Sequence, residues 1–558
     1  MASSSPVASA FSWLGKENNP NSTIQPYGYI ATAVLVIIFS LLLKVSKHDD
    51  LPLFQPTPKW FRPTFLAQME FFKTGKDFIA KGRATLPDKP YKVLSESGEI
   101  LVLPPRFANV IRNEEGLDFG AVIMRDLHGK IPGFQPFGFV DDDKKIIQVV
   151  ARKQLTKSLN TITEPLSLET AFAANLIFGE SQEWHQLPLK DTILDLIARL
   201  SSRVFLGPDL CRNEDWLRIT KDYTVLSFTA AVKLRAVPLR LRPLLHWFSA
   251  DCRRARESLA EAQKLITTVI EMRRAEKRAA AVAGAAGAAG AAGAAGAAGA
   301  AGAAGTQDSV APVSNDAIEW AEDEAQGGAY DAATFQLTLS FVAIHTTTDL
   351  LAQTLIYLAK EPELIGPLRA EIMEVLKAEG WKKSALYNMK LLDSAIKETQ
   401  RMKPVSMLLM RRLATKDVTL PDHNITIRRG QTVSVDSYSS IDPDVYEYPE
   451  TYDIHRFRRM REQPGGANKA QLVTTSPEHL GFGHGQHACP GRFFASNEVK
   501  VALCHLLLKY DWKLAPGSPS DPVIVGASMN VNPKAVVMVK RRVEEFDIDD
   551  LGFGDLDS

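Results

Sequence analysis

The stretch Phe482-Gly-His-Gly-Gln-His-Ala-Cys-Pro-Gly491 decides the fold of this 558-residue chain. It places a single cysteine, Cys489, in a loop with glycines at positions 483, 485 and 491. Glycine lets the backbone turn tightly and come close to a flat group, and Pro490 fixes φ just after the cysteine. The pattern indicates a loop that presents one thiolate to a ligand. A buried structural cysteine beside a glycine-rich turn is the alternative interpretation.

The pattern F-x-x-G-x-[RH]-x-C-x-G resembles the haem loop of the cytochrome P450 family. A thiolate ligand pushes electron density through the iron and favours O–O cleavage. The resemblance covers roughly residues 51–542 and implies the P450 fold, which is mainly α with small β-sheets. It also implies that Cys489 is the axial ligand of haem b. The cofactor-binding positions that it adds in this loop are Phe482, Gly483, Gly485, Gly491 and, for a propionate, His487.

Glu398 and Arg401 lie upstream with the i, i+3 spacing that puts both side chains on one helix face. Alone, such a pair is typical of a solvated helix surface. Here apolar residues precede it and Pro404 follows, which predicts a helix buried on one side. Arg456 lies in a segment that resembles the family's P-x-R-F element, with Ile454 in place of proline. The resemblance implies a buried Glu–Arg–Arg network that supports the cofactor site and takes no part in acid–base catalysis.

Apolar residues cover every face of the predicted helix Phe335–Lys360, which indicates a buried helix. The polar run His345–Asp349 in its middle resembles the family's oxygen-activating pattern [AG]-G-x-[DE]-T-[TS]. This match implies that Thr346 donates a hydrogen bond and relays protons, and that His345 takes the place of the usual acid. A histidine, with a pKa near 6.5, delivers protons differently from a carboxylate. The alternative is that His345 bonds a carbonyl at a helical kink.

Other positions follow from the same resemblance. Either Arg411 or Arg412 should bind a haem propionate, and the spacing does not choose between them. Arg152 and Lys153 are further candidates, although the tryptophan that normally marks their helix is missing. The resemblance also assigns plausible substrate-wall residues, for which core packing is an equally good explanation: Val342, Ala343, Thr347, Met407, Leu408, Leu409 and Met529.

Composition agrees with one large domain. A hydrophobic content of 45% allows a sizeable core, and a formal net charge of zero gives no support for nucleic-acid binding. The four cysteines match neither a disulfide framework nor a zinc site, which favours a reducing compartment.

The N-terminus predicts a membrane anchor. Residues 27–45 are largely apolar and are followed by Lys47 and His48, so the predicted orientation places the large domain in the cytosol. A cleaved signal peptide is the competing interpretation, but a basic region before the apolar stretch is missing. We therefore expect a lumenal tail (1–26), a transmembrane signal anchor (27–45), a proline-rich linker (46–60) and a catalytic domain (61–543).

Two low-complexity or acidic segments complete the chain. The Ala-Ala-Gly repeats of residues 283–305 predict a mobile surface loop with at most transient helix. Residues 544–558 predict an acidic, solvated tail. We expect long helices over Leu189–Phe205, Trp247–Ala283, Phe335–Lys360, Pro362–Glu379, Leu391–Met402 and Arg492–Lys509, and strands over Ile100–Leu103, Val418–Leu420, Thr432–Val435 and Ala535–Val539.

The resemblance implies a single-pass monooxygenase of the endoplasmic reticulum membrane in fungal secondary metabolism. It would insert one oxygen atom from O2 into an apolar terpenoid or polyketide-derived scaffold. Electrons would come from NADPH through the flavins of a separate NADPH–cytochrome P450 reductase, with cytochrome b5 as a second candidate partner. Two alternatives remain: rearrangement, desaturation or ring coupling on the same fold, and a non-catalytic haem binder.

Overall fold

The computed structural model describes residues 51–55, 64–138, 146–294, 315–326, 328, 330–421 and 425–551. From Pro52 onward these residues form one compact unit. The predicted lumenal tail and anchor, and much of the linker, lie outside the described residues. No helix within the described ranges is long and apolar enough to cross a membrane.

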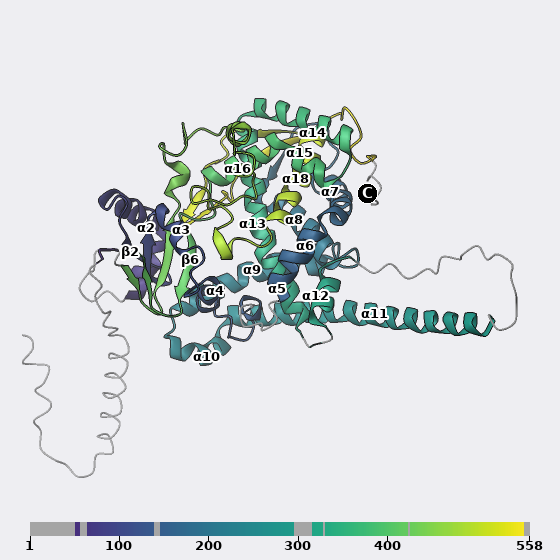
Figure 1. Ribbon diagram of the computed structural model, residues 1–558, viewed down its shortest axis with the longest axis horizontal. Helices are drawn as coiled ribbons and strands as arrows, with labels where there is room; N and C mark the ends of the chain where they lie inside the picture. The colour runs from purple at the N-terminus through teal and green to yellow at the C-terminus, as the bar shows by residue number, and fades with distance from the viewer. Residues whose placement is uncertain are drawn as a thin grey trace, which may run out of the picture. The chain divides into compact units, whose positions relative to one another are not determined.

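Helices dominate the described chain (Figure 1). They are α2 (Thr64–Thr85), α3 (Ala108–Ile111), α4 (Phe119–Asp126), α5 (Ile146–Val149), α6 (Leu155–Lys157), α7 (Leu159–Phe178), α8 (Leu189–Leu206), α9 (Glu214–Arg235), α10 (Arg242–Leu245), α11 (Ala250–Ala294), α12 (Ala317–Ala325), α13 (Ala332–Lys360), α14 (Ile365–Glu379), α15 (Lys383–Asn388), α16 (Lys390–Met402), α17 (Arg456–Glu462) and α18 (Arg492–Lys509). The strands are β1 (Leu53–Phe54), β2 (Tyr91–Ser95), β3 (Gly98–Leu103), β4 (Leu117–Asp118), β5 (His185–Pro188), β6 (Leu408–Ala414), β7 (Val418–Leu420), β8 (Ile425–Ile427), β9 (Thr432–Asp436), β10 (Tyr510–Leu514), β11 (Val523–Val525), β12 (Ser528–Asn530) and β13 (Val536–Arg541).

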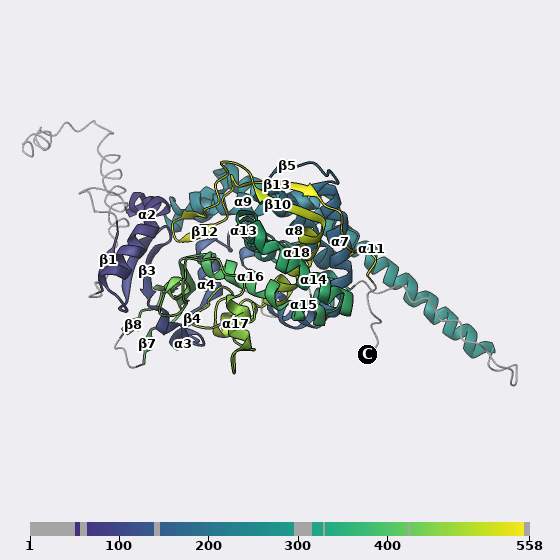
Figure 2. The ribbon, with the colours of Figure 1, turned by 90° about the horizontal axis from the view of Figure 1, so that it is seen from above.

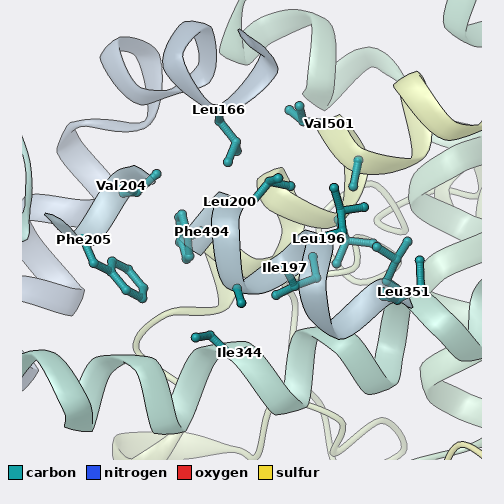
Figure 3. Packing of buried hydrophobic residues seen from close by; sticks show 14 of the residues in the cluster. Leu166, Leu196, Ile197, Leu200, Val204, Phe205, Ile344, Leu351, Phe494 and Val501 are labelled. Atoms are coloured by element: carbon teal, nitrogen blue, oxygen red, sulfur yellow. The ribbon is translucent and has the colours of Figure 1, made fainter. Parts of the chain in front are cut away.

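The core lies where α8 packs between α13, α7 and α18 (Figure 2). Figure 3 shows Ile197 of α8 on the side of Ile344 of α13 and Leu196 beside Leu351, whereas Leu200 lies on the opposite side of α8. Phe494 and Val501 of α18 lie on the other side of α8 (Figure 3). These side chains are almost fully buried, which fits the apolar pattern on every face of α13. The buried helix therefore forms as the sequence predicts.

The larger sheet contains β6 and β9, the two of its strands that follow α16 in the chain. Its strand order is β1-β2-β3-β9-β6-β4 within the described chain, and β6 pairs antiparallel with β9. The register of that pair shifts between Leu409 and Arg412, and Met410 adopts a positive φ of 50°. Such a bulge changes the direction of the side chains that follow it. It separates the neighbours Arg411 and Arg412, as described below.

Two expected segments differ from the structure. Helix α11 continues to Ala294, so the first repeats of the predicted 283–305 loop are helical; alanine favours helix strongly enough to continue an existing one. Residues 544–551 are not a free tail. Ile548 is fully buried, and its carbonyl accepts a hydrogen bond from the Trp381 indole at 3.2 Å. Lys509 pairs with Asp549 at 2.5 Å, so apolar and charged contacts both fix this segment.

Candidate active site

The Cys489 loop is shaped by its own backbone. The Cys489 N–H donates to the Phe482 carbonyl at 2.8 Å, and Gly483 and Gly485 have φ values of 71° and 76°. Burial raises the pKa of the Cys489 thiol, whereas hydrogen bonds from the backbone N–H groups of Gly491 and Arg492 lower it. Those donors would stabilise a thiolate. The loop thus offers one sulfur with its hydrogen-bond donors already in place.

Residues after α3 clamp the same loop from outside. The Gln486 N–H lies 3.3 Å from the Arg112 carbonyl and 3.0 Å from Asn113 Oδ1. A Cβ on Gly485 would lie 2.4 Å from the Arg112 carbonyl oxygen, so only glycine fits. Arg152, one of the open candidates, donates to the Gln486 carbonyl at 2.9 Å. Sequence analysis missed the α3 clamp, since Asn113 and Gln486 are 373 positions apart in the chain.

Glu398, Arg401 and Arg456 form a closed, buried network. Glu398 accepts two hydrogen bonds from Arg401, both at 2.8 Å, and one from Arg456 Nε at 3.0 Å. The other guanidinium N–H groups of Arg401 and Arg456 donate to backbone carbonyls, for example from Arg401 to Ser440 at 2.6 Å. Both Glu398 and Arg401 have side chains with no exposed surface. This is the arrangement that the family resemblance implied, and it fixes α16 to the segment around α17.

The structure separates the two neighbouring arginines of β6. Arg411 pairs with Asp126 at 2.8 Å and lies 3.6 Å from Glu96. Arg412 is buried and forms no ion pair within the described residues, and its Nε atom, like the Nε atom of Arg411, has no hydrogen-bond partner there. Burial lowers the pKa of Arg412 to about 10. Burial also lowers the pKa of His487, and the neighbouring Arg412 guanidinium adds to that shift. Arg412 and His487 therefore lie together, whereas Arg411 is engaged elsewhere.

Helix α13 carries an exposed stripe in its otherwise buried middle. Val342 is 43% exposed, and Thr346, one turn later, is also exposed. The Thr346 hydroxyl donates to the Val342 carbonyl at 2.8 Å. A hydroxyl that bonds its own helix can exchange that partner for another at little cost. In the middle of α13, only Val342 and Thr346 are exposed, so this stripe combines an apolar side chain with a hydroxyl.

His345 lies on another face of α13. It bonds the backbone of Lys221 on α9, while its buried Nε2 atom has no hydrogen-bond partner among the residues that the structure describes. Burial lowers the pKa of His345, and Lys190 adds to the shift. This contact matches the open alternative in which the ring bonds a carbonyl, although the carbonyl belongs to another helix. Successive helical residues point about 100° apart, which explains why His345 and Thr346 separate.

The predicted wall residues have different surroundings. Val342 is exposed, Ala343 and Met529 are partly exposed, and Leu409 is buried. Thr347 is buried and bonds Glu498 of α18, so it does not face the stripe. Leu408, with Met407 beside it, packs into a separate cluster around Phe71 and Ile79. Family position alone does not distinguish these environments.

Glu498 of α18 is a buried acid that sequence analysis did not single out. It accepts a hydrogen bond from Ser201 at 2.6 Å and bonds Thr347, and burial raises its pKa to about 8. Since α18 begins three residues after Cys489, this contact ties the cysteine loop to α13. The only sequence signal for Glu498 is its position nine residues after Cys489.

These residues fit a bound haem. A buried guanidinium with an unpartnered Nε lies beside an imidazole, as the propionates of a haem require. The Cys489 sulfur receives backbone N–H donors, which suits an anionic iron ligand. An exposed stripe on a buried helix is also what a flat apolar group would cover.

Comparisons with known proteins agree with this arrangement. The family model described as cytochrome P450 matches residues 212–539. Cytochrome P450 monooxygenase 1 of Gibberella fujikuroi is 42% identical over 83% of this chain and 100% of its own length. Cytochrome P450 monooxygenase hepE of Aspergillus oryzae is 42% identical over 95% of each chain.

A solved structure of retinoic-acid-bound cyanobacterial CYP120A1 has the same fold. It gives a TM-score of 0.61 at 16% identity, and the match covers 88% of this chain and 99% of that one. The fold, the cysteine loop and the extended likeness to fungal enzymes lead to one conclusion: the chain belongs to the cytochrome P450 family and is a P450 monooxygenase.

Proposed function

We propose that this monooxygenase inserts one oxygen atom from O2 into an apolar natural-product scaffold, terpenoid or polyketide-derived, in fungal secondary metabolism. The observation that carries the proposal is the exposed pair Val342 and Thr346 on α13, because it combines an apolar contact with a hydroxyl. The fungal origin of the similar enzymes supports the setting.

Haem b would be held by residues that converge from distant segments. Cys489 would supply the thiolate, and Arg412 with His487 would bind propionates, while Arg411 stays with Asp126. The buried network of Glu398, Arg401 and Arg456 would stabilise the cofactor site without contacting the substrate. When bound, the haem supplies the activation of dioxygen and the transfer of one oxygen atom.

The protein's own residues bind the substrate and move a proton. Thr346 Oγ1 carries a proton that is donated to the Val342 carbonyl, and rotation about χ1 would redirect it toward the exposed side of the stripe. Val342 would contact the apolar substrate. We assign His345 a positioning role between α13 and α9, since burial favours its neutral form and its ring bonds the Lys221 backbone.

Partners and location are part of the proposal. Electrons would come from NADPH through a cytochrome P450 reductase docked near the cysteine loop, with cytochrome b5 as an additional donor. Residues 27–45 would anchor the chain in the endoplasmic reticulum membrane with the catalytic domain in the cytosol, because this stretch is apolar and positive charge follows it.

An optical titration of the full chain in yeast membranes tests the proposal. A panel of terpenoid and polyketide scaffolds is added while the haem absorption is followed. Saturable conversion from low to high spin with one scaffold supports the site and identifies the substrate class. Turnover of that scaffold under labelled O2 then distinguishes oxygen insertion from rearrangement, desaturation or coupling. A wild-type protein without a haem-thiolate spectrum would overturn the assignment.

A further inference from the structure

Asp349 lies on the same face of α13 as the exposed stripe. Val342, Thr346 and Asp349 are spaced by four and three residues, which aligns them along one side of a helix. The first two side chains are exposed, whereas the Asp349 side chain retains 16% of its surface. The stripe therefore ends at a carboxylate that is covered by other parts of the chain.

A buried lysine covers this carboxylate. Lys403 Nζ contacts Asp349 Oδ2, and the Lys403 side chain is only 2% exposed. Lysine is almost never buried to this degree without a partner. Lys403 directly follows α16 and precedes Pro404. The ion pair consequently joins the end of the stripe to the start of the segment that follows α16.

The other carboxylate oxygen holds a second segment. Asp349 Oδ1 accepts a hydrogen bond from the Val531 backbone N–H at 2.7 Å, just after β12. The two segments also bond each other, because the Met529 N–H donates to the Val405 carbonyl at 3.0 Å. Val405 is 43% exposed, the same fraction as Val342. One aspartate thus fixes two chain segments, both of which carry apolar side chains, relative to α13.

We propose that the Asp349–Lys403 pair positions Val405, on the segment after α16, and Met529, on β12, as two walls facing Val342 and Thr346, and so determines which substrate shapes the site accepts. The inference rests on the proposed function, since it assumes that the stripe faces the bound haem and substrate. Both residues are positioning residues. Neither is expected to contact the reacting atoms.

The test compares a small and a bulky probe that bind haem iron in the same way. Imidazole needs little wall contact, whereas 4-phenylimidazole extends toward the walls. Dissociation constants for both are measured by optical titration of the full-length holoprotein. Asp349→Asn keeps an oxygen for the Val531 N–H but removes the negative charge opposite Lys403. We expect the ratio of the two constants to change about tenfold, which is the usual size of a shape mismatch in an apolar pocket.

A matched control separates positioning from general loss of stability. Asp316 forms another buried ion pair, with Arg273 at 2.8 Å, and caps the N-terminus of α12. Asp316→Asn keeps the capping oxygen and removes the charge, as Asp349→Asn does, but at a site on other elements. It should lower the melting temperature and leave the ratio of the two constants within twofold of wild type.

The double variant Asp349→Asn with Lys403→Met provides the decisive comparison. It removes the buried amine that Asp349→Asn leaves without its anionic partner, so the melting temperature should recover relative to Asp349→Asn. If the pair positions the walls, the ratio stays at least threefold from wild type. Recovery of both quantities together, or an unchanged ratio in Asp349→Asn, overturns the inference. A wild-type protein without a haem-thiolate spectrum instead overturns the proposed function, and this inference with it.

Discussion

The cysteine loop and the α13 stripe are stabilised in different ways. Ten consecutive residues make the loop, and its shape depends on backbone hydrogen bonds and on glycines at positive φ. The stripe combines two side chains of one helix with segments that follow α16 and β12, and Asp349 links them. A local backbone motif can be predicted from the sequence, whereas contacts between side chains from distant segments cannot. The two sides of the site should therefore respond differently to substitution.

The largest effect is expected at the loop's single sulfur. Cys489→Ser replaces the thiolate with a hydroxyl that stays protonated at neutral pH, so the strong anionic ligand is lost. We expect the absorption band of the thiolate-ligated ferrous–carbonyl form to disappear and turnover to fall to background. Carbon-monoxide difference spectra of equal amounts of folded protein measure this. Normal turnover by the variant would exclude Cys489 as the ligand.

The second-largest effect is expected when the buried Glu398–Arg401–Arg456 network is broken. Glu398→Gln leaves Arg401 and Arg456 buried without their anionic partner, and such changes cost about 3–5 kcal/mol. Urea unfolding followed by circular dichroism gives the free energy of unfolding. The exposed pair Arg218–Glu261 supplies the control, because its side chains are 51% and 53% exposed. Glu261→Gln should cost about 1 kcal/mol or less. Equal costs for the two variants would contradict a structural role for the network.

Gly485 tests whether the α3 clamp defines the loop. Gly485→Ala would force alanine into φ 76° and push its Cβ against the Arg112 carbonyl, at a cost of about 2–4 kcal/mol. Gly366 of α14 has no atom within 4 Å of an added Cβ, so Gly366→Ala should be neutral or slightly stabilising. Haem retention and the melting temperature are measured for both. A tolerated Gly485→Ala would show that the clamp is dispensable.

The sequence predicted the parts of the site that rest on local patterns. The cysteine loop, the buried helix α13 and the Glu398–Arg401 spacing all follow from motifs or periodicity. The proposal that Arg412 and not Arg411 binds a propionate depends on a bulge in β6, which no spacing rule predicts. The pairing of Asp349 with Lys403 joins residues 54 positions apart, and either charge read alone suggests a solvated surface.

The smallest effect concerns His345, on the α13 side of the comparison. Because burial holds its pKa below the usual 6.5, the unfolded state takes up a proton before the folded state does as pH falls. The free energy of unfolding should therefore decline below about pH 6.5, by up to about 1.4 kcal/mol per pH unit for this group, until the folded pKa is reached. His345→Gln keeps an N–H donor for the Lys221 carbonyl and removes the titration, so its curve should be flatter over that range. If the curve of His345→Gln followed wild type, the ring would take up its proton at the same pH in the folded and unfolded states, and burial would not be what keeps it neutral.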